Sequence, residues 1–99
     1  MIQHILLWSY KEDVPAARRA ALEAHLASLP AKIPVLRDVQ YGPVVGGRNQ
    51  SFSHCFVMRF DDLAALAEYT THPEHLNFSG PFKEACELQV VTDFEEMGP

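Results

Sequence analysis

The sequence predicts an α+β sandwich, in which a four-stranded antiparallel sheet carries its helices on one face. Four segments are rich in β-branched and aromatic residues, namely 2–10, 35–42, 52–60 and 88–94. Between the first pair and between the last pair of these segments, apolar residues recur at helical spacing. The resulting order, β-α-β-β-α-β, is the ferredoxin-like pattern, in which the first and third strands are central neighbours.

Length and composition limit the classes of function. The chain has 99 residues, so we expect one domain over residues 1–99. With 47% hydrophobic and 21% charged residues, the chain is typical of a folded globular domain rather than a disordered one. A net charge of −5 without a basic stripe argues against nucleic acid or an anionic membrane as partner.

The cellular location is predicted from three further features. The apolar runs are too short to cross a bilayer, and the chain opens on a strand-like pattern rather than on a signal peptide. Two cysteines, Cys55 and Cys86, both within apolar stretches, do not form a disulfide framework, and we expect them to be reduced. These features predict a cytoplasmic protein.

The first half of the chain predicts a central strand and a helix. In residues 2–10, "IQHILLWSY", both alternating sets are mostly apolar, as in a strand covered on both faces. Asp13 is expected to cap a helix over 14–30, which Pro30 and Pro34 would end. The apolar stripe of this helix contains Leu22, Leu26 and Leu29.

The second half predicts an edge strand, a loop, a central strand and two short helices. In residues 35–42 apolar and polar side chains alternate, which predicts a strand with one more polar face, near the edge of the sheet. Residues 42–51 are interpreted as a glycine-rich connecting loop. Asp61 or Asp62 is expected to begin a helix that runs to about Thr70. Pro73 is expected to open a second helix towards Gly80, with another turn or two before the last strand.

The sheet face opposite the helices is predicted to be apolar. Ile5 and Leu7 on the first strand, with Cys55 and Val57 on the third, would lie on it, exposed to water. A second copy packed sheet to sheet would cover them, so we expect a homodimer whose two sheets form an α/β barrel.

The stretch "YTTHPEHLNF", residues 69–78, holds the candidate chemistry. A neutral imidazole is available as a general base near pH 7, and a protonated phenol can donate a hydrogen bond to a developing oxyanion. Because Pro73 breaks the helix, the side chains of Tyr69 and His75 could both point onto the sheet. His75 as base and Tyr69 as hydrogen-bond donor would therefore be sound chemistry.

Four stretches resemble the stress-responsive dimeric α/β barrel family over nearly the whole chain: "MIQHILLWSYKE", "LPAKIPVLRDVQYG", "LAEYTTHPEHLNF" and "VVTDFE". The family's form is a dimer of ferredoxin-like protomers. Its best-understood branch resembles plant polyketide cyclases, which close a linear polyketide by an aldol step without a cofactor. This resemblance implies catalytic roles for His75 and Tyr69, and a place in or near the pocket for His4 and His54.

The predicted pocket is small. The bulky side chains of Trp8, Phe56 and Met58 are expected to point to the same side of the sheet as the pocket. Leu26, on the first helix, stands where the cyclase branch has a polar aromatic residue. We therefore expect a small aromatic or polyketide-like ligand rather than a long-tailed one. Besides the histidines of the two strands, the residues expected to line the pocket are Leu6, Trp8, Leu26, Phe56, Met58, His72 and Phe78.

Two other interpretations of the motif stay open. Tyr69 could be a core residue and "HPEH" only a helix start, in a non-enzymatic stress-response domain. Alternatively His72, Glu74 and His75 could bind zinc with His4 or His54, although the spacing is no recognised zinc pattern. We expect no cofactor and no metal, and Asp93, near the acidic C-terminal end, is interpreted as part of a solvated strand end. The sequence names neither an enzyme nor a substrate.

Overall fold

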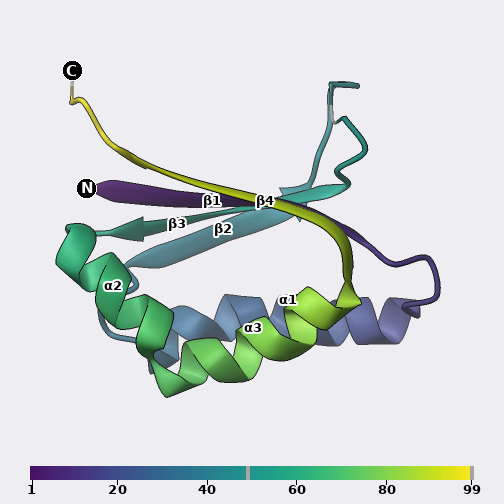
Figure 1. Ribbon diagram of the computed structural model, residues 1–99, viewed down its shortest axis with the longest axis horizontal. Coiled ribbons are helices and arrows are strands. Elements are labelled where there is room, and N and C mark those ends of the chain that lie inside the picture. The colour runs from purple at the N-terminus through teal and green to yellow at the C-terminus, as the bar shows by residue number, and fades with distance from the viewer. Residues whose placement is uncertain (49, 99) are drawn as a thin grey trace.

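A computed structural model describes residues 1–48 and 50–98 and shows two layers (Figure 1). The sheet has the strand order β2-β3-β1-β4, and all three helices cover one of its faces. The elements are β1 (Ile2–Tyr10), α1 (Ala16–Lys32), β2 (Asp38–Pro43), β3 (His54–Phe60), α2 (Leu63–Thr71), α3 (Pro73–Ala85) and β4 (Cys86–Glu95). This confirms the predicted α+β ferredoxin-like order.

Strand β1 is the centre of the sheet, as its two apolar faces predict. It pairs antiparallel with β3 on one side and with β4 on the other. Ile5 stands opposite Val57 of β3 and Thr92 of β4. Because directly paired residues of an antiparallel sheet point to the same face, this register fixes which side chains of β3 and β4 share a face with each residue of β1.

The hydrophobic core lies between the helix layer and the sheet. Its fully buried side chains come from both layers: Trp8, Leu26, Leu29, Ile33, Leu36, Met58, Phe60, Tyr69 and Phe78. Separating the layers would expose all of them, and the hydrophobic effect opposes this at about 25 cal/mol per Å² of apolar surface.

The helix boundaries differ from the prediction at three prolines. Pro15, in extended conformation, occupies the N-cap of α1 without a side-chain hydrogen bond, so Asp13 is not the cap. Pro30 lies inside α1, which continues to Lys32 because the buried neighbours Leu29 and Ile33 hold the last turn against the core. Helix α3 likewise continues through Pro81, so the two segments predicted there form one helix.

β1 has its predicted bounds, and the starts of the other three strands shift by two or three residues. β2 begins at Asp38, because the N–H of Leu36 donates to the Ile33 carbonyl in a turn that buries Leu36 in the core. β3 begins at His54, and β4 takes over from α3 at Cys86. Asp62 caps α2 as predicted, with its carboxylate accepting from the Ala65 N–H at 2.8 Å. Residue 49 of the predicted glycine-rich loop lies outside the described residues.

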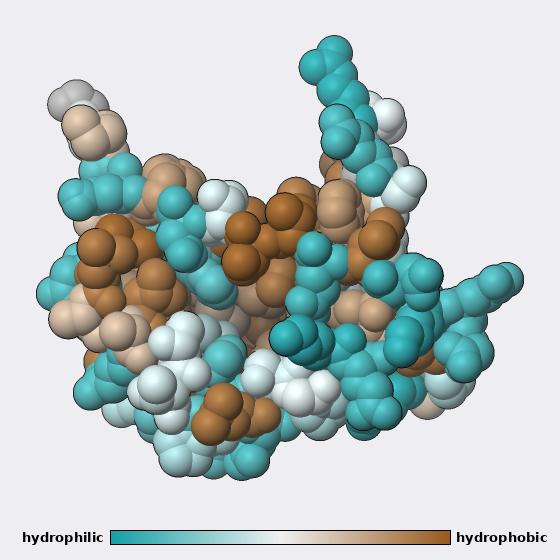
Figure 2. All heavy atoms as spheres, viewed as in Figure 1, coloured by the Kyte–Doolittle hydropathy of each residue, from teal (hydrophilic) through white to brown (hydrophobic). Residues whose placement is uncertain are grey.

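The sheet face opposite the helices is apolar and open. Figure 2 shows apolar side chains gathered above the helix layer. By register, Val90 and Phe94 of β4 share this face with Leu7 and Ile5, and both keep nearly half of their surface exposed, at 46% and 47%. Within the described residues, no helix is long and apolar enough to cross a membrane.

Leu26 tests the contribution of the buried helix face. We expect Leu26→Ala to lower the free energy of unfolding by about 2–5 kcal/mol, because it removes fully buried methyl groups and leaves a cavity. Leu63→Ala, at a site that is 66% exposed, should change it by less than about 0.5 kcal/mol. Urea unfolding at one fixed protein concentration measures both. Equal effects would contradict the assignment of the core.

Candidate active site

The corner between α2 and α3 is built by His72 and Pro73. A proline disfavours helical conformation in the residue before it, and His72 is extended, with φ −67° and ψ 136°. The His72 Nδ1 atom accepts a hydrogen bond from the Glu74 N–H at 3.1 Å and so caps α3. The His72 ring is thus engaged with the helix start, and His72 is not among the residues that line the cavity with Tyr69 and His75, where it was predicted.

Tyr69 and His75 meet at this corner. Their ring centroids are 4.4 Å apart, with Tyr69 at the end of α2 and His75 at the start of α3. Tyr69 is only 1% exposed, and burial raises the pKa of its hydroxyl, so the phenol stays protonated. That hydroxyl has no hydrogen-bond partner among residues 1–48 and 50–98. It is therefore free to donate to a ligand.

His75 has a defined tautomer. Its Nδ1 lies 3.0 Å from the Thr70 carbonyl oxygen, and because a carbonyl only accepts, Nδ1–H is the donor. The lone pair of the neutral ring is then on Nε2. Burial lowers the pKa of His75, and nearby His4 lowers it further, while the bond to Thr70 acts in the opposite direction. His75 is therefore a neutral base near pH 7.

His4 and Asp93 form a second polar pair. The two residues stand opposite each other on β1 and β4, and His4 Nδ1 lies 2.5 Å from an Asp93 carboxylate oxygen. The His4 ring centroid is 6.0 Å from that of Tyr69. The interpretation of Asp93 as part of a merely solvated strand end is thus incomplete, because its carboxylate holds the His4 ring. Strand parity places Asp93 on this face with Val91, but only the register shows its partner.

A cavity of about 280 Å³ joins these groups. Six residues predicted for the site line it: His4, Leu6, Phe56, Tyr69, His75 and Phe78. Sequence reasoning missed six more: Thr70, Ser79, Phe82, Lys83, Gln89 and Val91. Ser79, Phe82 and Lys83 follow His75 and Phe78 at helical spacing, which was the available signal for them.

Four other predicted lining residues, besides His72, lie away from the cavity. Met58 and Leu26 are fully buried in the core. Trp8 is also fully buried and stacks on His54, with centroids 5.2 Å apart. Trp8 contacts Phe82, with ring centroids 5.1 Å apart, and Phe82 rather than Trp8 is part of the lining. Trp8 therefore does not fill the pocket.

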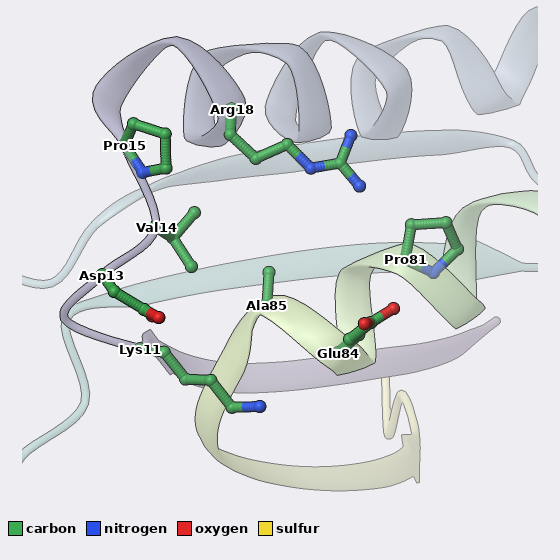
Figure 3. A pocket seen from close by; sticks show the side chains of 8 residues that line it. All are labelled: Lys11, Asp13, Val14, Pro15, Arg18, Pro81, Glu84 and Ala85. Atoms are coloured by element: carbon green, nitrogen blue, oxygen red, sulfur yellow. The ribbon is translucent and has the colours of Figure 1, made fainter.

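A second hollow lies beside the start of α1 (Figure 3). It measures about 340 Å³ and carries charges of both signs, from Lys11, Asp13, Arg18 and Glu84. It has no side chain whose ordinary pKa lies near neutrality, so it is a poor candidate for acid–base chemistry. Among the described residues, no three His, Cys, Asp or Glu side chains are grouped closely enough to hold a metal ion.

Known proteins resemble the chain along nearly its full length. The olivetolic acid cyclase of Cannabis sativa is 21% identical over 95 residues, covering 94% of this chain and 94% of that protein. The stress-response A/B barrel domain-containing protein HS1 of Arabidopsis thaliana is 29% identical over 96 residues, covering 95% and 88%.

Solved structures share the fold. A hydroxynitrile lyase from Passiflora edulis superposes with a TM-score of 0.91 at 24% identity, covering 99% of this chain and 96% of that one. A dimeric ferredoxin-like protein of unknown function from Bacteroides fragilis gives 0.75 at 27% identity, covering 96% and 95%. Residues 2–96 match the model of the stress responsive A/B barrel domain, and the chain belongs to this family.

Proposed function

We propose that the protein is a cofactor-independent cyclase or lyase that acts on a small aromatic or polyketide-like compound, with His75 as base and Tyr69 as hydrogen-bond donor. One observation carries this proposal. His75 Nδ1 is bound to the Thr70 carbonyl, which leaves Nε2 free beside an unpartnered tyrosine hydroxyl at the same cavity.

An aldol closure would use the two groups in turn. His75 Nε2 takes a proton from a carbon that lies between two carbonyl groups. The resulting enolate carbon then bonds to the carbon of another carbonyl group, farther along the same chain. The electron pair of that C=O bond moves to its oxygen, where the Tyr69 hydroxyl donates a hydrogen bond. The proton on His75 then passes to the alkoxide, which restores the base. No electron acceptor or donor is required.

The cavity and the relatives support this reaction class. At about 280 Å³ the cavity is just below the usual range for drug-sized ligands, roughly 300–1,000 Å³, which suits a compact substrate. The names of two similar proteins are those of a cyclase and a lyase, and both reaction classes can use a neutral base beside a neutral acid.

A non-enzymatic role in the stress response is the competing proposal. It is favoured by the structural use of the same motif: His72 caps α3, and His75 ties the end of α2 to the start of α3. Tyr69 also packs against Phe60, with centroids 5.1 Å apart. In this case the motif would join two helices, and the cavity would hold no substrate.

Tyr69→Phe separates the two proposals, because it removes only the hydroxyl. We expect the free energy of unfolding to stay within about 0.5 kcal/mol or to rise, since the hydroxyl has no hydrogen bond to residues 1–48 or 50–98 that could be lost. The rise in Tm caused by a phenol or a linear β-diketone should disappear. Turnover of a linear triketone should fall by about 100-fold or more. Tyr41→Phe, at an exposed site on β2, is the matched control.

A different result would favour the non-enzymatic proposal over the catalytic one. A loss of more than about 2 kcal/mol in Tyr69→Phe, with no ligand shift in wild type, would mean that the hydroxyl serves packing.

The pKa of His75 predicts a pH dependence of stability. Because the folded value lies below the unfolded value of about 6.5, the unfolded chain binds more protons as the pH falls. The contribution is fully present above about pH 6.5 and is lost as the pH drops to the lowered pKa. We expect His75→Gln to lose less unfolding free energy than wild type between about pH 7.5 and 5. Urea unfolding at both pH values measures this, and identical losses would contradict it.

We propose that the protein is a homodimer. The open sheet face carries apolar side chains that a second copy would cover, and a relative of the same fold is dimeric. Pairing sheet to sheet would close the two sheets into the α/β barrel for which the family is named.

Val90→Glu tests the dimer. This residue lies on the open face, and a carboxylate there would be buried without a partner in the interface. We expect light scattering at micromolar concentration to give a dimer for wild type and a monomer for Val90→Glu. Leu76→Glu, at a 56% exposed site on α3, should stay dimeric. A monomeric wild type would end the barrel proposal.

A further inference from the structure

We infer that Lys83 selects an anionic ligand, namely a small carboxylate. Its charged group would lie beside Lys83 in the last turn of α3, and its reacting carbon beside His75 in the first turn. This inference rests on the proposed function of the cavity and adds the chemical class of its substrate.

The lining of the cavity carries permanent charge of one sign only, which is positive. Among the described residues that line it there is no carboxylate, and Lys83 is its one side chain with a permanent charge. The other polar side chains of the lining carry no permanent charge: His4, Tyr69, Thr70, His75, Ser79 and Gln89. In a chain with 13 acidic and 8 basic residues, a lining of this sign is unexpected from composition alone.

Lys83 is not neutralised within the described part of the protein. Other cations of the chain form ion pairs, such as Arg37 with Asp61 and Arg59 with Glu96, whereas Lys83 forms none with any described residue. The next residue, Glu84, lines the other hollow, with Lys11 and Arg18 (Figure 3). The Lys83 ammonium is therefore available to a ligand carboxylate.

The spacing along α3 sets the length of that ligand. His75, Ser79 and Lys83 are four residues apart and lie along one side of the helix, all lining the cavity. At 1.5 Å per residue, the Cα atoms of His75 and Lys83 are separated by about 12 Å. His75 is half-buried and Lys83 is exposed, and both line the cavity, so one aromatic ring with a short acidic arm would span the gap. The Ser79 hydroxyl lies between the ends, over a floor of Leu6, Phe56 and Val91.

Lys83 has a second reason to be where it is. It lies in the last turn of α3, where a cation interacts favourably with the helix dipole. That interaction would act on stability and not on ligand choice, so ligand preference is the readout that separates the two roles.

The test uses two probes of the same shape, 4-hydroxybenzoate and its neutral amide, 4-hydroxybenzamide. Calorimetric titration at about pH 7.5 and low salt would compare wild type with Lys83→Gln, which keeps much of the stem and removes the charge. We expect wild type to bind the carboxylate about fivefold more tightly, which equals about 1 kcal/mol, and Lys83→Gln to bind both equally. The preference should shrink in high salt, because an exposed charge pair is screened.

Lys11→Gln is the matched control, because Lys11 also lacks an ion pair within the described residues but lies in the other hollow. It should keep the preference for the carboxylate. A preference that persists in Lys83→Gln would overturn the inference. Equal affinities in wild type, with binding lost in Tyr69→Phe, would overturn it and leave the proposed function standing. Absence of binding by either probe and by the β-diketone would overturn both.

Discussion

The peptide between His72 and Pro73 is the constraint on which the site depends. Pro73 forces His72 out of helical conformation, and the His72 ring then caps the helix that Pro73 begins. The chain turns without a loop, so the last turn of α2 faces the first turn of α3. Because of this turn, the Tyr69 and His75 rings lie 4.4 Å apart, and the Thr70 carbonyl is free of its helix and can accept from His75. This one turn between the helices thus both holds the two helix ends together and sets the geometry of the candidate site.

Burial favours the neutral form of both Tyr69 and His75. Desolvation disfavours the charged form of any side chain, so it raises the pKa of Tyr69 and lowers that of His75. Both groups are therefore neutral near pH 7, one able to donate a proton and the other able to accept one. The Asp93 carboxylate contributes from the sheet side, where it orients His4.

Residues that depend on local pattern were predicted well. Tyr69, His75 and Phe78 belong to one short stretch, and helical spacing with a proline break was enough to bring them to one place. The misplaced strand residues and the missed residues have different causes. Trp8, His54 and Met58 lie on the correct face of the sheet, but parity does not tell how far along a strand a cavity extends. Asp93 and Lys83 were missed because their importance depends on what stands opposite them.

The sequence by itself determined the order of the elements, the central position of β1 and the helix break at Pro73, because these follow from periodicity and from the backbone chemistry of proline. Only the tertiary structure decided which residues line the cavity. Register pairs His4 with Asp93, Trp8 is buried in the core rather than in the lining, and the continuous α3 places Lys83 on the same side as His75. These are relations between residues distant in the chain or several turns apart, and their distances are set by how two layers pack rather than by local preference.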